Sequence, residues 1–580
     1  MKKNKQKLIY PSRRQFLGMM GSSALAPLAV SPLTVLMTSL VDGILAKSQA
    51  QAAGMSLPPR NYVFINFAGG PPRWVWDMPL TPYKQEALIK NNHVNTRFKN
   101  STEAEYVTTA ITRKGVTLNM PHLWTSTIPT SSGGTVPMSV LLDNMLMIRG
   151  VKLPSDGHEN NNFKQLRPVN TAPSLNGAVA DRSGSPVPAV GLPHSPNDNY
   201  KSSKSIAQTV LSDIRGNPIQ SILSPFDNSK DGVSQSFRDK NKAIDAVVNK
   251  ALADLANQAK LSIPGSDALF SMRSDANSLL RRGIGDLQSV YSSLVNKYKQ
   301  LIARVAGSSI SGVTDVPIMQ GNLRDPKGII QHTIVESGHG FLGPQADLRQ
   351  LINANTTIAG LAENFAIAEY LLVNGYSNAV NMGAGGVTGL ALQDVYEILN
   401  GGVGKYKGNL FGEWVHDEHE GGAFASLIIN SFGFRAVSAC LYEFISTLKT
   451  ANLFNETVIQ IGGEFSRSAR NTFGGADHGW IAHATSLFSG AITKPIVLGN
   501  TLLQVPDWYP NGNAYKGSWG EAAPVKVDGI DQELSLGHTT STVAHLLRVE
   551  PPLANNSSLV IEGVGGVTPA IELARNINNT

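Results

Sequence analysis

Cysteine is almost absent from this chain. Cys440 is the single cysteine among 580 residues. One cysteine cannot close an intrachain disulfide, and it cannot supply the thiolate cluster of a structural metal site. A metal ion in this protein must therefore be held mainly by histidine nitrogens and carboxylate oxygens.

Charged residues are also scarce. They make up 16% of the sequence, whereas 42% of the residues are hydrophobic. The low charge argues against a disordered tail or a coiled coil, and the hydrophobic content is sufficient for a sizeable core. The 55 glycines and 32 prolines indicate many loops between the elements. A chain of 580 residues is long enough for either two ordinary domains or one large α/β domain with insertions.

The N-terminus carries an export pattern. Four lysines precede Ser12-Arg13-Arg14-Gln15-Phe16-Leu17-Gly18, and a moderately apolar stretch leads to Ala50-Gln51-Ala52. This order predicts a twin-arginine signal over residues 1–52, recognised by the twin-arginine translocase, and hence a periplasmic or extracellular protein. The alternative is a retained membrane anchor, because residues 19–45 are long enough to span a bilayer. Two prolines and the small residues near position 50 favour cleavage, so we expect no stable membrane span afterwards.

The signal accounts for the basic charge. The chain has a formal net charge of +6, with 49 Lys and Arg against 43 Asp and Glu. The predicted signal holds seven of the basic residues and one of the acidic ones, which leaves 42 of each sign. A near-neutral mature chain gives no electrostatic support for a nucleic-acid partner.

Short apolar runs alternate with stretches of helical spacing through residues 53–580. This alternation predicts an α/β fold, with a doubly wound, mainly parallel sheet that has helices on both faces. Residues 236–306 have helical spacing and predict two long helices, which we interpret as a helical insertion at 233–310. The predicted strands are 61–68, 140–151, 187–192, 377–382, 457–461, 494–499 and 558–562, and the other predicted helices are 174–180, 348–370, 424–451 and 535–547.

Polar residues follow the predicted strand 457–461. Gly462-Gly463 ends the strand, and the loop after it ends in Asp477-His478-Gly479. Ligands of open α/β sheets bind at the carboxyl ends of strands, and a carboxylate beside an imidazole suits zinc or a similar ion. The alternative interpretation is a polar loop in which Asp477 caps a turn and His478 is solvated.

Two further segments carry possible ligands. Residues 413–420 hold His416, Asp417 and His419 before two glycines, and the alternative there is a solvated charged helix. His538 precedes Thr539 and Thr540, either of which is expected to cap the helix, so His538 is expected to project from the loop on the strand side.

The strand predicted at 140–151 leads to another polar segment. Ser155-Asp156-Gly157-His158-Glu159 follows it, so a strand again delivers a histidine and carboxylates.

In this order the motifs resemble the alkaline phosphatase superfamily, and more closely the exported bacterial proteins of domain of unknown function 1501. The matching residues are Gly69-Gly70, Asp417-Glu418-His419, Glu464-Phe465-Ser466-Arg467-Ser468 and Gly475-Ala476-Asp477-His478. The resemblance implies an alkaline-phosphatase-like fold and two metal ions. It implies one ion held by Asp417, His419 and His538, and another held by Asp477 and His478.

The sequence departs from that pattern in two places. Pro71, Pro72 and Arg73 stand where the superfamily usually has a carboxylate directly after the Gly-Gly pair, so Asp77 would have to fold back to supply it. His416 is a further candidate ligand. The nucleophile is unassigned, and the candidate catalytic residues are Ser155, His158 and Arg467, where the arginine would grip an anion.

The resemblance thus predicts a metal-dependent hydrolase of phosphate or sulfate esters, acting on an anionic small molecule or polymer. Zinc is the expected metal, with calcium, magnesium or manganese as alternatives. Two other interpretations stay open. One is a metal-binding or envelope-assembly protein without catalysis on the same fold, and the other is a structural exoprotein without metal.

Overall fold

The computed structural model describes residues 57–67, 69–78, 96–100, 103–154, 158–185, 187–212, 214, 218–219, 287–308, 351–390, 413–414, 416, 423–465, 483–499, 501–502 and 521–570. Structural statements below concern these residues. The predicted signal, residues 1–52, lies outside them. Within the described part of the chain, no helix has both the length and the apolar character needed to cross a membrane.

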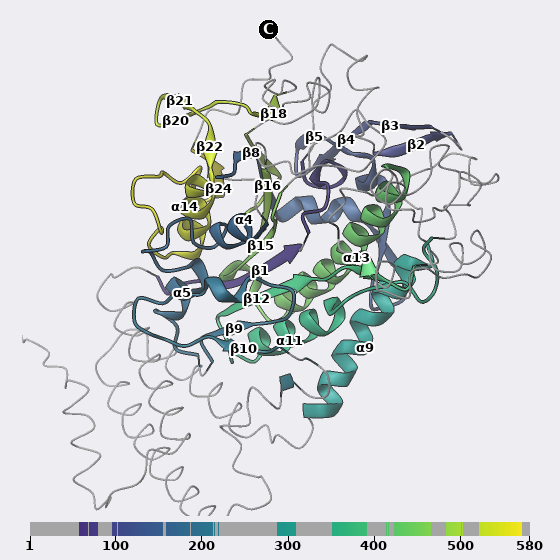
Figure 1. Ribbon diagram of the computed structural model, residues 1–580, viewed down its shortest axis with the longest axis horizontal. Coiled ribbons are helices and arrows are strands. Elements are labelled where there is room, and N and C mark those ends of the chain that lie inside the picture. Colours follow the sequence, from purple (N-terminus) through teal and green to yellow (C-terminus); the bar gives the residue numbers. More distant parts are fainter. Residues whose placement is uncertain are drawn as a thin grey trace, which may run out of the picture.

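A mainly parallel sheet forms the centre of the protein (Figure 1). Its strand order is β10-β9-β12-β1-β15-β16-β8-β17, and β22 pairs with β8 beside this path. Only β16 runs antiparallel to its neighbours, β15 and β8. The strands are β1 (Asn61–Phe67), β8 (Met145–Lys152), β9 (Ala189–Gly191), β10 (Thr209–Val210), β12 (Ala379–Ala384), β15 (Thr457–Gly463), β16 (His483–Phe488), β17 (Ile496–Leu498) and β22 (Leu534–Ser535). The predicted α/β class with a mainly parallel sheet is confirmed.

Helices cover both faces of this sheet because its central strands are apolar on both sides. On β1, Val63 and Ile65 belong to one core cluster, whereas Tyr62 and Phe64 belong to the other. The first cluster includes residues of α9 (Leu287–Ala306), α11 (Leu361–Val373) and α13 (Ala423–Thr450). The second includes residues of α5 (Leu175–Ala180) and α14 (Leu536–Leu547), and α4 (His158–Lys164) lies on the same side (Figure 1).

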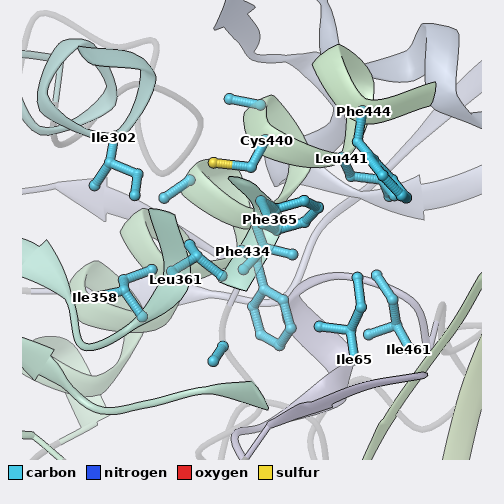
Figure 2. Packing of buried hydrophobic residues seen from close by; sticks show 14 of the residues in the cluster. Ile65, Ile302, Ile358, Leu361, Phe365, Phe434, Cys440, Leu441, Phe444 and Ile461 are labelled. Atoms are coloured by element: carbon cyan, nitrogen blue, oxygen red, sulfur yellow. The ribbon is translucent and has the colours of Figure 1, made fainter. Parts of the chain in front are cut away.

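The larger core joins the sheet to the three long helices. Figure 2 shows Ile65 and Ile461 of the sheet below Phe365 of α11 and Phe434 of α13. Cys440 lies in this core, and burial raises the pKa of its thiol. Burial of large apolar side chains, at about 1.5–3 kcal/mol each, is the main stabilising contribution here.

Short hairpins surround the main sheet. They are β2 (Arg97–Asn100) with β3 (Glu103–Glu105), β4 (Thr108–Arg113) with β5 (Val116–Pro121), β6 (Thr127–Pro129) with β7 (Thr135–Pro137), β18 (Thr501–Leu502) with β19 (Glu521–Ala522), β20 (Val525–Val527) with β21 (Ile530–Gln532), and β23 (Val560–Gly563) with β24 (Gly566–Pro569). A three-stranded sheet has the order β11 (Thr357–Ile358), β13 (Val387–Thr388) and β14 (Glu413–Trp414).

Two predicted elements were partly wrong. The strand expected at 140–151 begins at Met145, because Met138–Asn144 forms a 3-10 helix after Pro137. The helix expected at 348–370 begins at Leu361. Gly360 is its N-cap and has a left-handed conformation, with φ 69°, so the chain turns there from β11 into the helix.

The predicted helical insertion is described only from residue 287 onward. There α9 is amphipathic, and Tyr291, Tyr298 and Ile302 are buried against α11 and α13. This end of the segment is therefore part of the layer that covers the sheet.

Candidate functional site

The strands β1, β12 and β15 end at the same edge of the sheet. Their parallel registers pair Phe67 with both Ala384 and Gly463. Carboxyl ends of parallel strands are the usual ligand-binding edge of open α/β sheets. The side chains that leave this edge are therefore the candidates for a functional site.

A pair of glycines leaves β1 at this edge. Gly69 and Gly70 have φ values of 86° and 67°, which side-chain-bearing residues rarely adopt. A Cβ on Gly70 would lie 2.7 Å from Cδ2 of Phe465, the second residue after β15. The backbone N–H of Gly69 donates a hydrogen bond to Oε1 of Glu464, at 3.2 Å. The glycines thus bring the end of β1 against the end of β15.

His158 joins the same cluster from α4. Its Nδ1 forms a hydrogen bond with Oε2 of Glu464, and its ring packs edge-on against Phe465 with the ring centroids 4.7 Å apart. The carboxylate side chain is 8% exposed and the imidazole 34% exposed. A carboxylate that accepts from Nδ1–H fixes the tautomer that keeps the lone pair on Nε2. The imidazole is thus prepared to accept a proton or to bind a cation at Nε2.

Asp77 lies on the opposite face of the sheet from His158. Both of its oxygens accept hydrogen bonds from Arg73, with Oδ1 2.7 Å from Nε, and Oδ2 also accepts from Ser486 Oγ at 2.6 Å. Arg73 and Asp77 are both fully buried. Trp76, the residue directly before Asp77, stacks on Trp124. Ligation of a metal by Asp77 would therefore require its carboxylate to leave a buried ion pair.

His416 lies near the carboxyl end of β1. The residue has a left-handed φ of 54° and is 1% exposed, and its ring centroid is 6.2 Å from that of Phe67. Asn430 directs its amide N–H groups to Ser426, so its Oδ1 accepts from Nδ1 of His416 at 3.1 Å. This tautomer leaves the lone pair on Nε2.

His538 lies in the first turn of α14, not in a loop before it. The backbone N–H of Ser535 donates to its Nδ1 at 3.1 Å, so Ser535 is the N-cap and the expected caps at Thr539 or Thr540 were wrong. This bond requires a lone pair on Nδ1 and so places the ring proton on Nε2. Burial also lowers the pKa of His538. Metal binding through Nε2 would require that proton to leave and the capping bond to be given up.

His483 begins β16 at the same edge and was not predicted from the sequence. Its Nε2–H donates to the carbonyl of Gly463 at 2.7 Å, and Nδ1 has no partner among the described residues. Burial and the nearby Arg73 lower its pKa to about 3. The sequence signal that could have identified it is its position, five residues after the predicted ligand His478.

The other predicted site residues lie outside the described part of the chain. They are Ser155, Asp417, His419, Arg467, Asp477 and His478. The described residues on either side of 466–482, Phe465 and His483, both lie at the carboxyl edge. Among the described residues, no three His, Cys, Asp or Glu side chains are grouped so that they could hold a metal ion.

Comparisons with known proteins add no identification. No protein-family model, no curated protein and no solved structure matches this chain. The resemblance described above therefore rests on the sequence motifs.

Proposed function

We propose that this protein is an exported, metal-dependent hydrolase of phosphate or sulfate esters on an alkaline-phosphatase-like fold. The observation that supports it is the meeting of Gly69, His158 and Glu464 at the carboxyl edge of the sheet. His158 and Gly69 are 306 and 395 positions away from Glu464 in the chain. Gly69 and Glu464 belong to motifs that carry the resemblance.

In this proposal His158 moves the proton of the attacking oxygen. Nε2 accepts that proton as the attacking oxygen forms its bond to phosphorus or sulfur. It then donates the proton to the ester oxygen as the bond between that ester oxygen and phosphorus or sulfur breaks. Glu464 keeps the ring in the required tautomer and stabilises the imidazolium that forms. Because Gly69 holds the other carboxylate oxygen, the pair is oriented before the substrate binds.

The proposed cofactor is a divalent metal, with zinc first and calcium, magnesium or manganese as alternatives. When bound, such an ion neutralises the charge of the tetrahedral anion. The proposed ligands are Asp417, His419, Asp477 and His478, together with His538 if its capping bond is released. Of His416 and His538, His416 has the better tautomer for this role, because Asn430 occupies its Nδ1 and leaves the lone pair on Nε2.

Hydrolysis of 4-nitrophenyl phosphate and 4-nitrophenyl sulfate by zinc-loaded protein tests the proposal. A general base typically contributes about 10²–10⁴ in rate, so His158→Gln should lower kcat by at least about 100-fold. His545→Gln is the matched control, because His545 is exposed in the last turn of α14. A His158→Gln variant that keeps the wild-type rate would refute this role.

One observation favours the alternative of a metal-binding or envelope-assembly protein without catalysis. The carboxylate expected after Gly69-Gly70 is absent, and the substitute, Asp77, is occupied by Arg73 and Ser486. A protein that retains about one equivalent of metal by elemental analysis and hydrolyses neither ester would support this alternative.

A further inference from the structure

A rigid turn follows β9 at the same sheet edge. The backbone N–H of Leu192 donates to Asn381 of β12 at 2.8 Å, and that of Gly383 donates to Pro193 at 3.2 Å. Asn364 of α11 also donates to the Pro193 carbonyl at 3.2 Å. The turn is therefore fastened to both the sheet and the helix above it.

The turn presents His194 in an uncommon backbone conformation. His194 has a φ of 62°, in the left-handed region, and Asn66 of β1 donates from Nδ2 to its carbonyl at 3.3 Å. A Cβ on Gly383 would lie 1.9 Å from that carbonyl oxygen, so only glycine fits beneath it. A left-handed non-glycine residue persists where its surroundings determine it, as they do here.

Glycines also hold the ring of His194. Its Cδ2 and Nε2 lie 3.1 and 3.3 Å from the position of a Cβ on Gly360, and its Cε1 lies 2.9 Å from that on Gly385. The edge that contains Cδ2, Nε2 and Cε1 thus lies against the glycines, and Nδ1 is the ring nitrogen outside this edge. The residue is nonetheless exposed. Among the described residues, neither ring nitrogen has a hydrogen-bond or ion-pair partner.

His194 lies along the same sheet edge as the proposed reaction centre. His194 lies over β12, and Glu464 follows β15, with β1 between the two strands. Adjacent strands are about 4.8 Å apart, so the two residues are separated by roughly 10 Å along the edge.

We propose that His194 contacts the alcohol part of the substrate through Nδ1, and that this alcohol carries hydroxyl groups, as in a sugar or polyol ester. The inference rests on the proposed hydrolase function. Gly360, Gly383 and Gly385, which lie against His194, carry no charge, so the position suits a neutral hydroxyl better than a second anion. An imidazole can donate to or accept from a hydroxyl, and a fixed ring loses little entropy on binding.

Comparison of two esters tests this contact. The assay measures kcat/KM for glucose 6-phosphate and 4-nitrophenyl phosphate, or for the corresponding sulfates if the protein hydrolyses sulfates. One hydrogen bond to a neutral group is worth about 0.5–1.5 kcal/mol, or roughly 2–13-fold. His194→Asn should lower kcat/KM by that factor for the sugar ester only, because 4-nitrophenol has no hydroxyl to bind there. An equal loss for both esters, or no loss for either, would overturn the proposal.

Two further variants separate side-chain contact from backbone strain. His194→Gly keeps a left-handed residue without strain, so its melting temperature should equal or exceed that of the wild type while selectivity is lost. His545→Asn is the control that should change neither quantity.

If the wild type hydrolyses neither ester, the proposed function fails. A binding assay then tests the His194 contact separately. Calorimetric titration compares glucose 6-phosphate with inorganic phosphate. Tighter binding of the sugar phosphate that disappears in His194→Asn supports the contact. Equal binding of the two ligands, or an advantage that survives in His194→Asn, contradicts it.

Discussion

Replacing Asp77 by asparagine is expected to destabilise the protein strongly. Arg73 and Asp77 are fully buried, and the carboxylate receives hydrogen bonds from the guanidinium and from Ser486. Asparagine has nearly the same shape, so the substitution leaves no cavity. It does leave the Arg73 cation in the core without a counter-charge, which typically costs about 3–5 kcal/mol.

Equilibrium urea denaturation, followed by tryptophan fluorescence, measures this effect. Trp76 reports on the region because its ring stacks on Trp124 beside the ion pair. Glu105→Gln is the matched control. It breaks the Arg97–Glu105 pair, whose side chains are 28% and 30% exposed, and should cost less than about 1 kcal/mol.

A double variant separates the loss of the pair from the unpaired charge. Arg73→Met with Asp77→Leu removes both charges, and apolar replacements of buried pairs are often close to neutral. This variant should therefore be more stable than Asp77→Asn. The reasoning is refuted if Asp77→Asn is as stable as Glu105→Gln, or if it instead loses one equivalent of bound metal, because Asp77 would then be a ligand.

Three other predictions concern pH, a glycine and export. The pKa of His483 is about 3 in the folded protein and about 6.5 ordinarily, so the unfolded state binds more protons between these two pH values. The stability that the neutral imidazole contributes should be fully present above about pH 6.5 and should fall as the pH drops toward 3. Urea midpoints measured over this range should fall less steeply in His483→Gln. Gly70→Ala should lower the free energy of unfolding by about 1–3 kcal/mol more than Gly133→Ala, because both glycines have positive φ but only Gly70 has an atom, at 2.7 Å, in the place of the new Cβ. Arg13→Lys with Arg14→Lys should leave precursor in the cytoplasm by cell fractionation, and normal export would contradict the signal.

The central sheet could be predicted because its strands have a strong pattern. The runs 61–68 and 457–461 are apolar on both faces and end at glycines, and they form the adjacent parallel strands β1 and β15. The boundaries at 140 and 348 could not be predicted in this way. A 3-10 helix and a left-handed Gly360 interrupt apolar sequence there without changing its composition.

The candidate site could be predicted only as separate segments. His158 and the motif that contains Glu464 were both identified, but their hydrogen bond depends on how α4 lies across the sheet edge. The sequence placed Arg73 where a metal was expected, whereas its charge is neutralised by Asp77 four residues later. His538 has the spacing of a capping-box residue as well as the chemistry of a ligand. Its Nδ1 accepts the capping bond from Ser535, and its Nε2 lies 3.4 Å from Nδ2 of Asn556.

A double-mutant cycle on His158 and Glu464 tests the central claim most directly. The cycle compares kcat/KM for wild type, His158→Gln, Glu464→Gln and the double variant on the better 4-nitrophenyl ester. If the carboxylate acts through the imidazole, the double variant should lose about as much as His158→Gln alone, with a coupling of at least about 1.4 kcal/mol, or tenfold. Losses that multiply independently, or single variants that keep the wild-type rate, would show that the two residues do not form the reaction centre.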